Sequence, residues 1–372
     1  MRLESRFRVQ GRKPTVMGTG LVALDVVISP NPSAAPRLWA GGTCGNVLTI
    51  LSYLGWKALP ISRMNGDLAS RRVKEDLAHW GVDLRFVDLR PRTRSPIIVQ
   101  RILRDSIGKP YHTFSFSCPA CGAPLPRYKP VFRSLANAIF QEIRSVDILF
   151  LDRVSPIALS LAEAAIARGA LVAFEPTGVG DRTLFRKILC LTHIFKYSHQ
   201  RFQHLSEVAP SEASYIEIMT LGSGGLRYRS NLPSCRTEWC SLDAYTVTDF
   251  KDTAGAGDWC MAGFLHVVGR CGLEGFRKIG RAELRRALSF GQALAAWNCR
   301  FEGARGGMYT SKKKTFWRDV ARIMSGSHVR MPVAEHTPRR VRETFSIICG
   351  NCSDQSKTLH AAETKQKRQR SA

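Results

Sequence analysis

The sequence predicts an α/β protein built on a mostly parallel β-sheet with helices on its faces. Short apolar runs of the kind that form buried strands occur at 146–151, 171–174, 189–195 and 216–220. Stretches with helical patterning lie between them, at 131–144, 158–168 and 181–189. Strands that alternate with helices are typical of a parallel sheet. The 372 residues, 44 % of them hydrophobic, allow one large α/β domain or two small ones.

The N-terminal part is predicted to begin with a strand and two helices. Residues 15–28 are apolar and β-branched, which indicates a first strand that carries Asp25 near its end. A helix is expected over 44–54, and a second over 71–80 that ends at Gly81, a suitable C-cap.

A hairpin and two further helices complete the predicted core. Two short strands at 97–103 and 112–116 flank a turn that contains Gly108, and they predict the hairpin. Helices are expected over 259–270 and 281–297, after the last strands.

The composition of the sequence changes near Lys312, where basic clusters and a polar tail begin. We expect a core over 1–311, with the hairpin at about 97–117 followed by a Cys-x-x-Cys insert at 118–121. A basic extension over 312–352 contains a second Cys-x-x-Cys, and the polar tail 353–372 is expected to be disordered.

The strongest indication of chemistry is the run Asp-Thr-Ala-Gly-Ala-Gly-Asp at 252–258. Its glycines let the backbone turn tightly, and the apolar run that follows predicts a buried helix. Unpaired N–H groups and the helix dipole then favour a phosphate at this N-terminus. The predicted anion hole consists of Ala254, Gly255, Ala256 and Gly257. Asp258 is the predicted general base for an attacking hydroxyl, although Asp beside glycines is also a common helix cap.

The full run resembles the C-terminal signature of the ribokinase-like (PfkB) carbohydrate kinases. Other places match that family in the same order: 18–25, 41–46 with 51–55 and 64–67, 218–225 and 303–307. The last of these resembles the family's Gly-Ala turn near the adenine and the monovalent-cation loop. The resemblance implies a ribokinase-like fold in which the hairpin belongs to a small β lid over the substrate. It also implies transfer of a phosphoryl group from ATP to a hydroxyl of a sugar, nucleoside or related small molecule.

The resemblance also implies which residues hold the phosphoryl acceptor. They are Asp25, Gly41, Gly42, Asn46 and Asp67. A carboxylate suits this role because it accepts two hydrogen bonds from a diol, and paired glycines let the main chain approach the ligand. Taken alone, Asp25 could equally be a turn residue at the end of a strand.

On the nucleotide side, the resemblance implies that ATP is bound by Lys196, Thr220, Gly222 and Gly225. Mg²⁺ would bridge the phosphates, and a monovalent cation such as K⁺ would lie near Asp252. One departure concerns the family's Asn…Glu element, associated with metal-bound phosphate, which Ser198, His199 and Gln200 replace here. Glu207 or water would have to take over its role.

Four of the eleven cysteines form two Cys-x-x-Cys pairs, which have the spacing of zinc knuckles. They are Cys118 with Cys121 and Cys349 with Cys352. Together they would make one structural Cys₄ zinc site, provided that folding brings the two distant pairs together. Unrelated thiols or a redox pair are the alternatives, although a thioredoxin-like βαβ setting is missing. The family does not generally carry this feature.

The chain is strongly basic, with 55 Lys and Arg against 30 Asp and Glu and a formal net charge of +25. This excess allows nucleic acid or another polyanion as a partner, or simply a solvated basic surface. A kinase-fold protein that binds nucleic acid and catalyses weakly or not at all is therefore the alternative to an active kinase.

Localisation and assembly are also predicted. No run of about 18 uncharged apolar residues occurs, so we expect no membrane span. The first residues, Met1 to Arg6, lack the apolar region of a secretion signal, and we expect a cytoplasmic protein. Lids in the family often pair, so a homodimer through the lid is expected.

Overall fold

The computed structural model describes residues 7–9, 11–90, 93–132, 136–202, 215–270, 272–327 and 341–352. Glu207 and the predicted tail 353–372 lie outside these residues. Among the described residues, no helix has both the length and the apolar character that crossing a bilayer requires.

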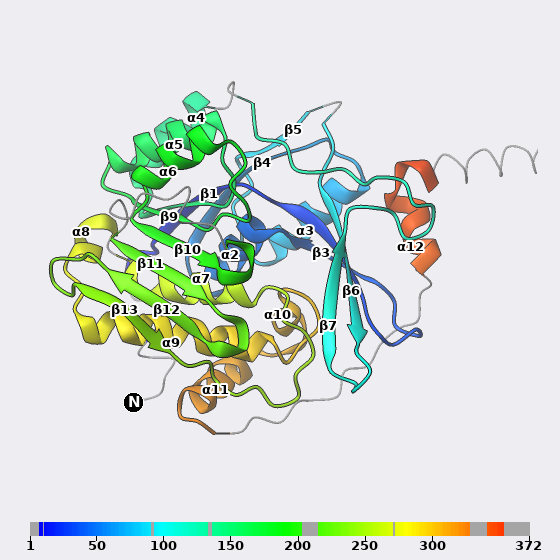
Figure 1. The fold of residues 1–372 in the computed structure, drawn as a ribbon. Helices are drawn as coiled ribbons and strands as arrows, with labels where there is room; N and C mark the ends of the chain where they lie inside the picture. The colour runs from blue at the N-terminus through cyan, green and yellow to red at the C-terminus, as the bar shows by residue number, and fades with distance from the viewer. Residues whose placement is uncertain are drawn as a thin grey trace, which may run out of the picture.

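A nine-stranded sheet in the order β13-β12-β11-β10-β9-β8-β1-β4-β5 forms the body of the molecule (Figure 1). The central strands are β1 (Thr15–Thr19), β4 (Lys57–Met64), β5 (Val87–Leu89), β8 (Ile148–Leu151), β9 (Leu171–Phe174) and β10 (Ile194–Ser198). The other edge consists of β11 (Ile216–Thr220), β12 (Leu226–Ser230) and β13 (Thr237–Leu242). Neighbours pair in parallel except at β11-β12-β13, which are antiparallel. This confirms the predicted mostly parallel sheet.

Helices cover both faces of this sheet because its strands alternate apolar side chains to either side. Val16 and Ile148 pack into one layer, with the helices α2 (Thr43–Tyr53), α7 (Ala256–Val268), α8 (Gly272–Arg277) and α9 (Arg281–Asn298). Met17 and Leu149 pack into the other, with α4 (Ala136–Glu142), α5 (Pro156–Ile166) and α6 (Arg182–Cys190). Figure 1 shows these two helical layers on opposite sides of the sheet.

A four-stranded sheet in the order β3-β2-β6-β7 forms the predicted lid. Its strands are β2 (Ala23–Ile28), β3 (Arg37–Gly41), β6 (Ile97–Arg104) and β7 (Pro110–Ser115). β6 and β7 form the expected antiparallel hairpin, and β2 joins it in parallel to β6. The predicted fold class, a helix-flanked parallel sheet with a small β lid, is therefore confirmed.

Two predicted strands needed correction. Residues 15–28 are not one strand, because β1 lies in the large sheet and β2 in the lid. The chain leaves the large sheet where the N–H of Leu21 donates to Asp152 Oδ1 at 2.8 Å. The strand expected at 189–195 begins only at Ile194, because Leu189 still belongs to α6.

The first helix of the predicted C-terminal extension packs into the hydrophobic core. Helices α3 (Leu68–His79), α10 (Gly306–Thr310), α11 (Lys313–Met324) and α12 (Val341–Ile348) complete the described elements. Phe316 of α11 is fully buried, and its ring lies 4.8 Å from that of Trp297 in α9. α11 thus shares the hydrophobic core with the preceding residues, and the chain beyond it leads to α12. The predicted boundary at residue 311 stays a prediction.

Candidate active site

Residues 254–257, here called the glycine loop, and Asp258 lie at the start of α7, as the sequence predicted. Gly255 precedes the helix with φ 72°, and a Cβ there would meet the carbonyl oxygen of Ala304 at 2.3 Å. Only glycine therefore fits at this position. Asp258 lies in the first turn of α7, and its Oδ2 accepts a hydrogen bond of 2.7 Å from Asn46 Nδ2. The structure thus brings the predicted general base into contact with Asn46, one of the residues predicted to hold the acceptor.

The carboxyl group of Asp258 lies in a surrounding that favours its protonated form. Burial is the main cause, followed by the charge of Glu175, and together they raise the pKa of Asp258 to about 8. The hydrogen bond from Asn46 and the charge of Lys196 act in the opposite direction. A carboxyl group with such a pKa can exchange a proton near neutral pH, which suits a general base.

Asp25 lies on β2, directly beside the glycine pair. A Cβ on Gly41 would fall 1.9 Å from Asp25 Oδ2, so this carboxylate rests against bare backbone. Asp25 is 8 % exposed, and its Oδ1 is buried without a hydrogen-bond partner among the described residues. Burial raises the pKa of Asp25 to about 7, although the nearby Arg305 and the N–H of Gly42 oppose the rise. An unpartnered buried oxygen is well suited to a ligand hydroxyl.

Arg305 connects the acceptor side of the site to Asp258. Its Nε donates to Asn46 Oδ1 at 3.0 Å, and its Nη2 lies 2.9 Å from Asp76 Oδ2. Asp76 also accepts from the hydroxyl of Tyr309 at 2.7 Å. The chain Asp76–Arg305–Asn46–Asp258 therefore fixes which end of the Asn46 amide faces Asp258. The sequence suggested an adenine-side turn for this segment, and its spacing gave no sign of these contacts.

Glu175 is a residue of this site that the sequence analysis missed. It directly follows β9, and its Oε1 accepts a hydrogen bond from Lys196 Nζ on the neighbouring β10. A Cβ on Gly257 would lie 3.3 Å from Glu175 Oε1 and 3.4 Å from Lys196 Nζ, so the ion pair borders the glycine loop. Glu175 Oε2 is buried without a hydrogen-bond partner among the described residues. Its place at the carboxyl end of a parallel strand was the signal that could have revealed it.

Asp152 is a second carboxylate at this edge that the sequence analysis did not single out. It follows β8, and Arg153 Nη1 donates to its Oδ2 at 2.8 Å. Burial raises the pKa of Asp152 to about 6 against the opposing charge of Arg153. The charge of Glu175 contributes to the raised pKa values of both Asp152 and Asp258, so these three carboxyl groups lie close to one another.

Asp252 is held by the lid and by the loop that it begins. Its Oδ2 accepts from Gln100 of β6 and, at 2.8 Å, from the N–H of Gly303. Its Oδ1 lies 2.7 Å from His112 Nδ1 of β7 and 3.0 Å from the N–H of Ala254. A carboxylate has about four lone-pair sites, so these donors occupy it. The cation near Asp252 therefore stays a prediction, and its binding would require Gln100 or His112 to move.

The other predicted nucleotide residues lie along the same sheet edge. Thr220 ends β11 opposite Ser198, the last residue of β10, and its hydroxyl donates to the carbonyl of Tyr197 at 3.3 Å. Gly222 and Gly225 form the following turn, which the N–H of Leu221 closes on the carbonyl of Gly225 at 2.8 Å. These residues share an edge with Lys196, but their role in binding ATP stays a prediction.

Asp67 has a local partner in the structure. It is the N-cap of α3, and its Oδ1 accepts from the N–H and the hydroxyl of Ser70, both at 2.7 Å. This cap explains the position of Asp67 without a ligand. Its predicted contact with the acceptor stays a prediction.

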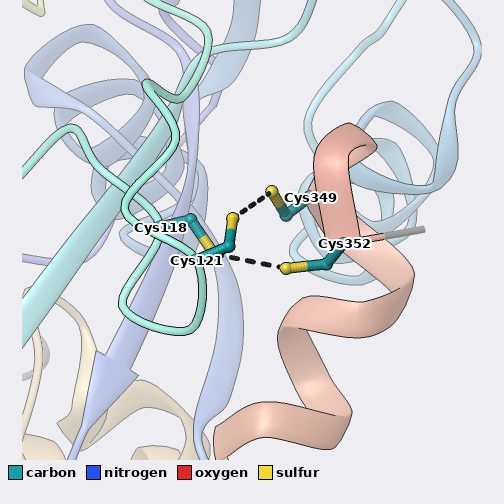
Figure 2. Close-up of side chains that lie close together, drawn as sticks. All are labelled: Cys118, Cys121, Cys349 and Cys352. Carbon is teal, nitrogen blue, oxygen red and sulfur yellow. Dashed lines mark hydrogen bonds between the residues drawn. The ribbon is translucent and has the colours of Figure 1, made fainter. Parts of the chain in front are cut away.

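The two cysteine pairs meet, as the sequence predicted they could. Figure 2 shows the knuckle of Cys118 and Cys121 facing Cys349 and Cys352 at the end of α12. The four sulfur atoms all lie within 4.8 Å of one another, an arrangement that could hold a metal ion.

Solved structures with this fold include sugar and nucleoside kinases. Ribokinase from Giardia lamblia superposes with a TM-score of 0.62 at 15 % identity, over 82 % of this chain and 99 % of that one. Arabidopsis thaliana ribokinase, complexed with ribose and ATP, gives 0.61 at 16 %, over 84 % and 99 %. The nucleoside kinase of Methanocaldococcus jannaschii gives 0.56 at 17 %, over 85 % and 99 %. At these identities the likeness shows the fold. Among curated protein sequences, none matches this chain.

The fold and the glycine loop with its aspartate define a class, the small-molecule kinases with an alcohol acceptor. The chain belongs to the pfkB family of carbohydrate kinases, whose sequence model matches residues 29–311.

Proposed function

We propose that this protein transfers the γ-phosphoryl group of ATP to a hydroxyl of a sugar, nucleoside or related small molecule. The observation that carries the proposal is Asp258, hydrogen-bonded to Asn46 in the first turn of α7 and directly behind the glycine loop. Family membership supports the reaction class.

Asp258 is the proposed general base. Asn46 donates to its Oδ2, which leaves Oδ1 to take the proton from the attacking hydroxyl. The N–H of Ala254 already donates to Asp252, and that of Ala256 donates to the carbonyl of Thr253. Of the four residues predicted for the anion hole, Gly255 and Gly257 are thus the best placed to face the transferring phosphoryl group.

The residues beside the loop suit a divalent cation. Glu175 offers a carboxylate oxygen without a hydrogen-bond partner in the part of the chain that the structure describes, and carboxylate oxygens are preferred ligands of Mg²⁺. Glu175 would take the place of the missing Asn…Glu element. Glu175 would hold a cation that binds together with ATP, and the cation would neutralise the charge of Glu175, which otherwise raises the pKa of Asp258. Lys196, paired with Glu175, would face the ATP phosphates.

Turnover of ATP over a panel of sugars and nucleosides tests the proposal. We expect one acceptor class to stimulate turnover, and Asp258→Asn to reduce it by about 10²- to 10⁴-fold. Asp181→Asn is the matched control, because Asp181 caps α6 far from the glycine loop in sequence and outside the site contacts described above. Near wild-type turnover by a folded Asp258→Asn variant would overturn the assignment. Binding of RNA or DNA without any turnover would favour the alternative, a nucleic-acid-binding protein.

The lid supports the predicted homodimer. Its hairpin exposes large apolar side chains, with Tyr111 47 % and Phe114 49 % exposed. Such residues often mark a contact surface. We propose that two lids pair, and light scattering on the full chain would then give twice the chain mass.

A further inference from the structure

We propose that Cys118, Cys121, Cys349 and Cys352 bind one zinc ion. This ion would clamp α12 to the turn that directly follows β7 of the lid. The proposal is independent of the kinase reaction. It rests on the arrangement of the sulfur atoms, the local structure of the first cysteine pair and the packing of α12.

Two of the distances between the sulfur atoms have the length that a tetrahedral zinc site requires. Zn–S bonds of about 2.3 Å in a tetrahedron place neighbouring sulfurs about 3.8 Å apart. Cys118 and Cys352 are separated by 3.8 Å between Sγ atoms, and Cys121 and Cys349 also by 3.8 Å. These two pairs are opposite edges of one tetrahedron, and the remaining edges stay within 4.8 Å. Four ligands complete the coordination shell, so the metal would be structural and not catalytic.

The first cysteine pair lies in a tight turn that points backbone N–H groups at sulfur. The N–H of Gly122 donates to the carbonyl of Cys118 at 2.8 Å and closes the turn. The N–H groups of Ala120 and Cys121 face the sulfur of Cys118, and that of Ala123 faces the sulfur of Cys121. Donors of this kind stabilise negative charge on sulfur, which a metal-bound thiolate carries.

The two halves of the site come from elements with separate attachments to the body. The knuckle follows β7 directly, and the N–H of Leu125 returns to the carbonyl of Phe116 at 2.8 Å. α12 packs against α3, and Phe345 of α12 is fully buried. A helix of eight residues has little stability alone, so the metal would supply much of its anchorage.

The clamp links two elements that carry residues of the candidate active site: β7, through the knuckle that follows it, and α3, through α12, which packs on it. β7 carries His112, which contacts Asp252 at 2.7 Å. α3 carries Asp76, the partner of Arg305. Zinc would therefore hold the lid strand and α3 at a fixed separation on the acceptor side of the molecule.

Metal analysis of the full chain tests the site. We expect about one zinc per chain, and loss of zinc in Cys121→Ser and in Cys352→Ser, whose side chains are only partly buried. Cys190→Ser is the matched control, because Cys190 is exposed and lies outside the cluster. A metal-free wild-type protein, iron in place of zinc, or full zinc content in both variants would overturn the proposal.

Two further measurements keep the test decisive if the variants fold poorly. After zinc has been removed from the wild-type protein, added Co²⁺ should give the absorption of a tetrahedral thiolate complex. A spectrum without this absorption would contradict the site. Hydrogen exchange should rise in 110–125 and 341–352 on removal of zinc and stay unchanged in α5. Unchanged exchange in 341–352 would refute the clamp.

Discussion

Replacing Asn46 by alanine should move the pH dependence of the reaction in a direction that the structure fixes. Asn46 Nδ2 donates to Asp258 Oδ2 at 2.7 Å, and this bond is one of the influences that lower the pKa of Asp258. Without it, burial and the charge of Glu175 act with less opposition. The apparent pKa of Asp258, the proposed general base, should therefore rise above its value of about 8.

The size of the change follows from the strength of the lost bond. A hydrogen bond to a charged group contributes about 1.5–3 kcal/mol, which corresponds to a rise of about 1–2 pH units in the pKa. At pH 7.5 the ionised fraction of Asp258 would then fall about 10- to 100-fold. The loss should recover as the pH is raised, because Asp258 itself is unchanged.

The assay is kcat/KM against pH, which reports the pKa values of the free enzyme. The position of the inflection is the test, because Asn46 is also a predicted acceptor residue and its loss could lower the plateau. Thr49→Val is the control, since it removes a buried hydrogen bond to the carbonyl of Gly45 further along the same helix. A profile of the Asn46→Ala variant that superposes on the wild type in its inflection would refute the reasoning.

Three further predictions concern other residues of the site. The pKa of Asp258 is raised from 3.8 to about 8, so between these values the folded protein holds a proton that the unfolded chain has released. Stability should therefore fall as the pH rises through this range, and Asp258→Asn should unfold at a higher temperature than the wild type at pH 8 but not below pH 4; equal melting temperatures at pH 8 would contradict this. Glu175→Gln should raise the Mg²⁺ concentration for half-maximal turnover about tenfold, and an unchanged Mg²⁺ titration would remove Glu175 from the metal site. Gly41→Ala places a methyl group 1.9 Å from Asp25 Oδ2, so the acceptor KM should rise about tenfold with the ATP KM unchanged. Gly280→Ala, which meets nothing within 4 Å, is its control, and equal effects on both KM values would place Asp25 elsewhere.

The sequence predicted the site residues that are neighbours in the chain. It missed the site residues that only the order of the strands and the packing of the helices bring together. The glycine loop and Asp258 occupy adjacent positions, so their placement at the start of α7 follows from local rules. Glu175 and Asp152 each follow a different strand, and only the parallel pairing of those strands brings them to one edge. Arg305 gave no signal either, because its partner Asp76 lies on a distant helix.

For the cysteine pairs, too, the sequence predicted the local structure but not the contact between distant segments. Their spacing predicted two knuckles, and the sequence could not decide whether the knuckles meet. The packing of α12 on α3 is what brings Cys349 and Cys352 to Cys118 and Cys121. That packing buries Phe345 in the same hydrophobic cluster as Val73 and Leu77 of α3, which lie far away in the sequence.

The position of the second cysteine pair has a consequence for how the protein is made. Chains emerge from the ribosome from the N-terminus, and early segments can fold while later ones are still being synthesised. The large sheet, the lid and the glycine loop are all complete before Cys349 is translated. With the zinc site as proposed, a nascent chain would carry a folded catalytic body with two open thiol ligands, and the metal would bind last. The zinc content of a preparation could then not exceed the fraction of its chains that have been translated to residue 352 and have remained intact.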